Sequence, residues 1–250
     1  MTEQNIDIII CLGRGSSHGD DELRILLRSL ERNVSGTGRI FIATHYAPKW
    51  LESSKITVVD IDDIYTDNKD ANLHRKTLEV IRRYDIGRFC WLSDDVVFLK
   101  SVDLKDVPIL RGFTPCGEFQ PDRIWTNRLC HTFDFARSVG ADIHFSYEVH
   151  APQVFDGRLL LEKMDGVDYV IQPGLTIFTA WRAVCGQIGL PDEQPFTGWK
   201  ETLSTDVAAV NAKLDRPFVG YNDDAFDVID FRKRLFRIFN EKSIYERSEK

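Results

Sequence analysis

The chain has 250 residues, of which 43% are hydrophobic and 28% are charged. This composition is that of an ordinary globular protein with a sizeable core, and it excludes collagen, low-complexity polymers and gross disorder. With 32 basic and 39 acidic side chains, the net charge is -7. A broad nucleic-acid-binding surface is therefore not expected, and any anion must be bound locally.

No stretch of the chain approaches the roughly 20 apolar residues that a bilayer span requires. Residues 1–5 lack the basic and apolar regions of a signal peptide, so we expect a cytoplasmic protein. The five cysteines are widely spaced and include no C-x-x-C pair: Cys11, Cys90, Cys116, Cys130 and Cys185. This pattern predicts reduced thiols, with neither a disulfide framework nor a structural zinc site.

The first hundred residues alternate between short apolar runs and amphipathic segments. Residues 6–12 predict a strand buried on both faces, and the leucines of residues 23–30 have the spacing of a helix that Asp20 or Asp21 can cap. Further strands are expected at 40–43, 56–61 and 89–92, with a helix at 72–84. This alternation predicts an α/β fold with a mostly parallel sheet and helices on both faces.

Beyond residue 100 the periodicity is weaker, and Pro108, Pro115 and Pro121 predict mixed strands and loops. Helices are expected again at 158–164, 176–185 and 228–239. Because we find no repeat and no linker, we expect one domain over residues 1–250. Residues 1–100 would form its nucleotide-binding half, and residues 101–250 its acceptor-binding and catalytic half.

Polar residues follow each predicted strand, at the place where open α/β sheets bind ligands. Ser93, Asp94 and Asp95 come directly after a buried strand, and apolar residues resume at once. Two adjacent carboxylates repel each other unless a cation neutralises them, and Mg²⁺ or Mn²⁺ shared with substrate phosphates is a common solution. The alternative is a solvated turn, since turns are rich in aspartate.

A glycine-rich turn, Gly13-x-Gly15-x-x-x-Gly19, joins the first strand to the first helix. Such a turn could present backbone amides to a phosphate, and Arg14 could bind the same group or be solvated. NAD binding is not expected, because the second strand ends in Thr44 and His45 rather than in an acidic residue.

The second half offers one candidate base and one further acidic tract. Pro152 keeps the residue before it extended, which places His150 in a rigid loop. A histidine there could take a proton from an acceptor hydroxyl, or it could be structural. Asn222, Asp223 and Asp224 follow an apolar pair, and they could complete a metal site or cap the last helix.

The last predicted helix carries a basic face formed by Arg232, Lys233, Arg234 and Arg237. Such a face could contact an anionic membrane surface peripherally, or it could simply face solvent.

Three tracts together resemble the Stealth family of sugar-phosphate transferases, which includes capsular polysaccharide phosphotransferases and N-acetylglucosamine-1-phosphotransferase. The second region of that family is similar to residues 20–32, 40–44, 48–51, 56–59 and 92–96. Its third region is similar to residues 150–153, and its fourth to residues 222–224 and 239–243. The three regions occur in the family's order over most of the chain.

The resemblance implies a glycosyltransferase A-like fold and transfer of a hexose 1-phosphate from a UDP-sugar to a glycan hydroxyl, with Mg²⁺ or Mn²⁺ and release of UMP. The implied catalytic residues are His150, Asp94 and Asn222, and the implied metal ligands are Asp94, Asp95 and Asp223. Substrate contacts are expected from Asp7, Arg14, Arg24, Thr44 and Ser93, where Ser93 replaces the asparagine that is usual in the family. A glycosyltransferase that releases UDP and an inactive nucleotide-sugar-binding relative remain alternatives.

Overall fold

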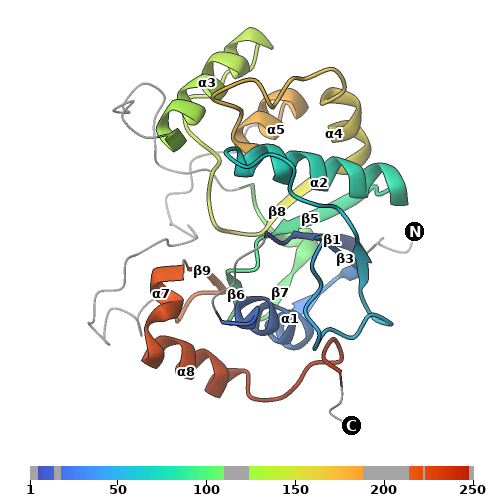
Figure 1. Cartoon of the computed structure of the whole chain (residues 1–250), viewed down its shortest axis with the longest axis vertical. Coiled ribbons are helices and arrows are strands. Elements are labelled where there is room, and N and C mark those ends of the chain that lie inside the picture. The colour runs from blue at the N-terminus through green and yellow to red at the C-terminus, as the bar shows by residue number, and fades with distance from the viewer. Residues whose placement is uncertain (1–4, 14–17, 110–123, 188–213, 222, 248–250) are drawn as a thin grey trace.

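The computed structural model describes residues 5–13, 18–109, 124–187, 214–221 and 223–247 (Figure 1). At its centre is a five-stranded sheet in the order β4-β3-β1-β5-β8. Four strands run parallel: β1 (Ile6–Cys11), β3 (Thr37–Ala43), β4 (Thr57–Val59) and β5 (Arg88–Leu92). At one edge β8 (Gln153–Asp156) pairs antiparallel with β5. The predicted α/β class with a mostly parallel sheet is confirmed.

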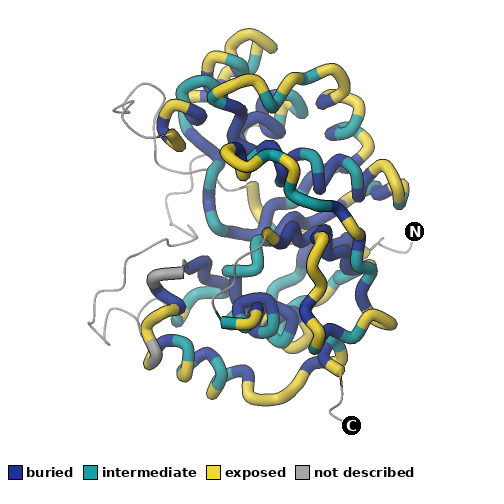
Figure 2. Tube along the Cα trace, viewed as in Figure 1, coloured by how far each residue is buried: buried dark blue, intermediate teal, exposed yellow. Residues whose placement is uncertain are grey.

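Helices cover both faces of the sheet. Helix α1 (Asp21–Asn33) lies below it in Figure 1. Four helices lie above it: α2 (Lys69–Tyr84), α3 (Ile124–Ser138), α4 (Gly157–Lys163) and α5 (Ile177–Cys185). Strand β1 serves both sides, since Ile8 and Ile10 pack with the leucines of α1 whereas Ile9 and Cys11 pack with α2. Every residue of β1 is consequently buried, as Figure 2 shows.

A smaller layer packs against the outer side of α1. Strand β6 (Val96–Phe98) pairs antiparallel with β9 (Phe218–Gly220), and two helices follow, α7 (Asp223–Asp227) and α8 (Ile229–Ile238). Phe226, Phe231 and Leu235 from these helices bury their side chains with Ile25 of α1. Two short strands, β2 (Val34–Ser35) and β7 (Val102–Asp103), pair nearby and lead into a 3-10 turn at Leu104–Asp106.

The elements predicted from periodicity are present, and two expectations are wrong. Asp20 stands at the N-cap of α1 but adopts a left-handed φ of 61°, and its side chain makes no capping hydrogen bond. Helix α3 was not expected where mixed strands and loops were predicted. Its buried residues include Leu129, Phe133 and Ala136, but its first two residues, Ile124 and Trp125, are exposed, which weakens the apolar stripe.

Two expectations about thiols and membranes can be compared with the described part of the chain. Cys11, Cys90, Cys130 and Cys185 are free thiols, and Cys116 lies outside the described residues. Within the described ranges, none of the helices has both the length and the apolar character needed to cross a bilayer.

The order of the strands fixes where a ligand site can form. The helix that follows β1 lies on one face of the sheet, whereas the helices that follow β4 and β8 lie on the other. The connections therefore change direction between the adjacent strands β1 and β5. In folds of this kind, ligands bind in the crevice at the carboxyl ends of those two strands. Ser93, Asp94 and Asp95 follow β5 at this edge.

Candidate functional site

Asp95 is held through both of its carboxylate oxygens. Oδ2 lies 3.0 Å from Nδ1 of His150, and Oδ1 accepts a short hydrogen bond from the hydroxyl of Ser93. Because an ionised carboxylate can only accept hydrogen bonds, Nδ1 of His150 carries the proton of the neutral ring. The other ring nitrogen, Nε2, then has a free lone pair, and the side chain of His150 is 34% exposed.

The tract near residue 220 also reaches this site. The backbone amide of Tyr221 donates a 2.9 Å hydrogen bond to the carbonyl oxygen of Asp95, as a continuation of the pairing between β6 and β9. Gly220 packs so closely on His150 that an added Cβ would overlap the carbonyl oxygen and the Cβ of that histidine. The structure therefore brings together three segments far apart in the sequence, around residues 95, 150 and 220.

The two adjacent carboxylates have opposite electrostatic environments. Desolvation, together with the charges of Asp95 and Glu22, raises the pKa of Asp94 well above its ordinary value. Burial also acts to raise the pKa of Asp95, but the hydrogen bonds from His150 and Ser93 outweigh it, so that pKa is lowered. Asp95 therefore stays ionised beside the histidine, while Asp94 holds its negative charge at a cost that a bound cation would relieve.

Three further side chains lie close to these carboxylates. Glu22, in the first turn of α1, is 7% exposed and raises the pKa of both Asp94 and Tyr221. The hydroxyl of Tyr221 is buried and has no hydrogen-bond partner among the described residues. Lys69, the first residue of α2, is exposed, and its charge lowers the pKa of both Asp94 and Asp95.

The donors at this edge are hard oxygens, which suit Mg²⁺ or Mn²⁺. Within the described part of the chain, however, no group of three or more His, Cys, Asp or Glu side chains is arranged to hold a metal ion. Asp94, with Asp95 beside it, fits the common arrangement in which one or two carboxylates hold Mg²⁺ and substrate phosphates complete its shell. The position of the Asp223 side chain lies outside the described residues.

Two residues predicted to contact substrate lie elsewhere. Asp7 lies opposite Phe89 at the amino end of the sheet. At a rise of about 3.3 Å per residue, this position is about 13 Å along the strands from Ser93. The carboxylate of Asp7 forms an ion pair of 2.6 Å with Arg39. Arg24 stacks over Trp50 and lies 3.5 Å from Glu246, so its guanidinium is turned to the C-terminal segment. Neither side chain joins Asp94 and His150.

Thr44 lies at the same sheet edge as Asp94, just after β3, but its hydroxyl is already engaged. The side chain donates to the carbonyl oxygen of Tyr46 at 2.8 Å and accepts from the amide of that residue at 3.0 Å. Thr44 thus closes a turn and is 2% exposed. Arg14 and Asn222 lie outside the described residues, and Asp223 begins α7 with only its backbone described.

Sequence reasoning missed Glu22 and Lys69. Glu22 was part of the expected first helix, and the signal for it was the run of three acidic residues, Asp20 to Glu22, at a helix that starts from the ligand-binding edge. Lys69 lies outside the predicted helix, because α2 begins three residues earlier than the expected boundary at residue 72. Its place at the edge of the sheet was therefore hidden.

Comparison of the chain with known protein families and with curated protein sequences finds no match.

Proposed function

We propose that this protein is a Stealth-type transferase with a glycosyltransferase A-like fold. It would move a hexose 1-phosphate from a UDP-sugar to a hydroxyl of a glycan acceptor and release UMP. The proposal is supported by the three tracts of the resemblance, of which those similar to the family's second and third regions supply Asp95 and His150. It is supported further by the position of these residues at the carboxyl edge between β1 and β5.

The hydrogen bond between Asp95 and His150 carries the mechanistic part of the proposal. A general base needs a free lone pair, a fixed orientation and access to the proton it removes. Asp95 fixes the ring through Nδ1 at 3.0 Å, which leaves Nε2 to accept the proton of the acceptor hydroxyl. In this arrangement Asp95 orients the base, a role that the sequence did not assign to it, and Asp94 remains the principal carboxylate for a cation.

The proposed step exchanges one bond to phosphorus. The acceptor oxygen attacks the β-phosphorus of the UDP-sugar, its proton passes to Nε2 of His150, and the bond to the bridging oxygen breaks so that UMP leaves. A divalent cation bound through Asp94 would supply charge neutralisation on the diphosphate. Lys69 stands near both carboxylates and adds a positive charge for the same diphosphate. Positioning and charge stabilisation lower the barrier.

Two further parts of the proposal concern partners. We propose that the protein acts in the cytoplasm on glycan acceptors, and that its C-terminal helix provides peripheral membrane contact. Lys233 and Arg237 of α8 are exposed, as such contact requires. Arg232 is partly buried and hydrogen-bonds to the ring of His18, so it belongs to the packing of this helix rather than to its outer face.

The nucleotide product tests the proposal directly. The protein is mixed with UDP-N-acetylglucosamine, Mg²⁺ and a panel of glycan acceptors, and the products are followed by ³¹P NMR. We expect UMP together with a new phosphodiester signal, and we expect both to vanish in His150→Ala. Release of UDP without UMP would reject phosphotransfer in favour of an ordinary glycosyltransferase. Metal-dependent binding of the UDP-sugar without release of any nucleotide would favour an inactive relative.

A further inference from the structure

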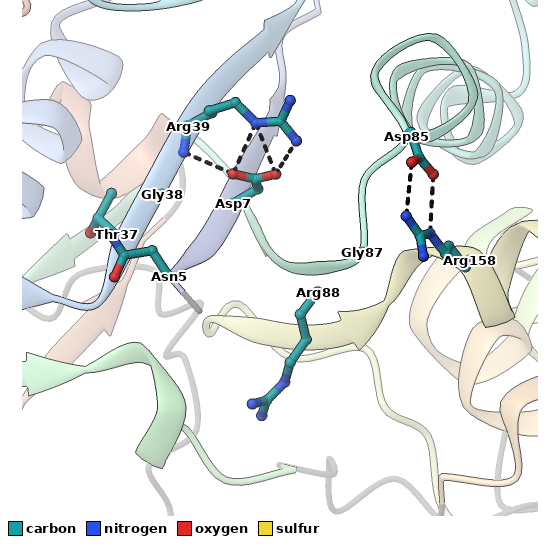
Figure 3. A pocket seen from close by; sticks show the side chains of 9 residues that line it. All are labelled: Asn5, Asp7, Thr37, Gly38, Arg39, Asp85, Gly87, Arg88 and Arg158. Carbon is teal, nitrogen blue, oxygen red and sulfur yellow. Dashed lines mark hydrogen bonds and ion pairs between the residues drawn. The ribbon is translucent and has the colours of Figure 1, made fainter. Parts of the chain in front are cut away.

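A polar hollow lies at the amino end of the sheet, opposite the edge that carries Asp94 and His150. It encloses about 510 Å³ between the starts of β1 and β3, the turn before β5 and the first turn of α4 (Figure 3). Its lining residues are Asn5, Asp7, Thr37, Gly38, Arg39, Asp85, Gly87, Arg88 and Arg158. Three arginines and two aspartates thus line the hollow, in a protein whose net charge is -7.

Both carboxylates of the hollow are already neutralised by an arginine. Arg39 binds both oxygens of Asp7 through Nε and Nη2, at 2.6 to 3.3 Å. Arg158 binds Asp85 through Nε at 3.0 Å and Nη2 at 2.8 Å. Gly38 makes the first pair possible, because a Cβ there would lie 2.6 Å from Oδ1 of Asp7. Each is a bidentate ion pair, a geometry that fixes the orientation of the guanidinium.

Arg88 is the cation that remains. Among the described residues it has no hydrogen bond and no ion pair, and in Figure 3 its side chain extends away from the two arginine–aspartate pairs, with no dashed line to either. Its cross-strand neighbour in β8 is Asp156, whose carboxylate instead accepts a 2.9 Å hydrogen bond from the amide of Leu159 as the N-cap of α4. The charge of Arg88 is therefore available to a ligand.

We infer that this hollow, which we call the amino-edge site, binds the phosphate group of a small polar ligand. The fork of Arg88 matches the oxygens of a phosphate, and the polar side chains of Asn5 and Thr37 can bind the rest of such a ligand. The site lies at the other end of the sheet from Asp94 and His150, so its occupancy does not depend on the proposed transfer activity.

The test uses inorganic phosphate as the probe and the full-length protein labelled with ¹⁵N. We expect saturable shifts of the backbone amides of Gly38 and Gly87, which line the amino-edge site, at matched ionic strength. Arg88→Gln should weaken phosphate binding about tenfold, as expected for loss of a charge-assisted hydrogen bond. The matched control is Arg137→Gln, which changes an exposed arginine of α3 outside the hollow and should leave the affinity unchanged.

A second arm with glucose 6-phosphate separates the two sources of this chemistry. Tighter binding than inorganic phosphate would assign the site to phosphate monoesters, and equal or weaker binding would assign it to free phosphate. The inference is overturned if neither probe shifts Gly38 and Gly87, or if Arg88→Gln binds as tightly as the unchanged protein. Shifts confined to residues 93–95 would also overturn it, while they would leave the proposed transferase site intact.

Discussion

Nδ1 of His150 lies 3.0 Å from Oδ2 of Asp95, although 55 residues separate the two in the chain. This contact joins the loop before β8 to the loop after β5, at the sheet edge where the fold places ligands. The contact gives the two adjacent carboxylates different roles, because Asp95 faces the histidine and Asp94 does not. The proposed function depends on this division.

Replacing Asp95 by Asn should cost about 10² to 10⁴ in the rate of UMP release, the usual range for loss of a correctly positioned base. The amide of Asn can donate to Nδ1, which favours the wrong tautomer of His150. The effect should lie in kcat, with donor affinity changed little, when measured by steady-state kinetics and by calorimetry. A loss of donor affinity as large as the loss of kcat would instead make Asp95 a metal ligand.

Gly220→Ala should displace the His150 loop or strand β9, because the new Cβ overlaps backbone and side-chain atoms of His150. We expect a loss of about 1 to 3 kcal/mol in the free energy of unfolding, as for other overpacked sites, together with reduced transfer. Urea denaturation followed by circular dichroism measures the first quantity. Gly87→Ala is the matched control, since a Cβ at Gly87 meets no atom within 4 Å.

If the two alanine variants lose the same stability, the tight contact between Gly220 and His150 does not constrain the fold.

Glu246→Gln should loosen the C-terminal segment from α1. Both oxygens of Glu246 accept hydrogen bonds from Arg28, at 2.6 and 2.8 Å, and the two side chains are 4% and 9% exposed. Removing one partner leaves a buried charge unpaired, so we expect a loss of about 3 kcal/mol in the free energy of unfolding. Glu162→Gln, in an exposed pair with Lys163, should change it by less than about 0.5 kcal/mol.

Equal effects of the two substitutions in chemical denaturation would mean that the C-terminal segment is not held by the Arg28 pair.

The buried ring of His74 should make the free energy of unfolding fall as the pH is lowered. Its Nδ1 accepts a 2.9 Å hydrogen bond from the indole of Trp181, and burial lowers the pKa of its ring to about 3. In the unfolded chain, where a histidine has its ordinary pKa of about 6.5, the ring binds a proton at pH values at which the buried ring of the folded protein stays neutral. The stabilisation is therefore complete above about pH 6.5, and it is lost as the pH falls toward 3.

The free energy of unfolding, measured from pH 7 to pH 4, should fall less steeply in His74→Gln than in the unchanged protein. The difference should approach about 1.4 kcal/mol per pH unit, the contribution of one proton. Carboxylates contribute to both curves, so the difference isolates His74. Parallel curves would show that its ring becomes protonated without unfolding.

The sheet could be predicted from the sequence because its strands are short apolar runs that stand out from the segments between them. The apolar run of β1 is buried on both faces of the sheet, and the leucines of α1 recur at the spacing of one helix face. Helix α3 could not be predicted, since its exposed Trp125 and Ile124 blur the stripe. An element could be predicted where its apolar residues are regularly spaced, and it could not be predicted where that spacing is interrupted.

The same contrast holds for the candidate site. Asp95 was identified because it follows a strand, and His150 because it stands two residues before a proline, which are local features. The amino-end position of Asp7 was not foreseen, because it depends on strand register: Asp7 lies opposite Phe89, and its carboxylate binds the guanidinium of Arg39. The orienting role of Asp95 toward His150 required the folded geometry.

Calorimetric titration with UDP-N-acetylglucosamine tests most directly whether the carboxyl edge around Asp94 binds the nucleotide sugar. It should be done with Mg²⁺ and with EDTA, using Asp94→Asn and the control Asp85→Asn, which changes an exposed aspartate at the opposite end of the sheet. We predict binding that requires Mg²⁺, is at least about tenfold weaker in Asp94→Asn and is unchanged in Asp85→Asn. Binding that survives EDTA, or equal affinities in the two variants, would contradict the account.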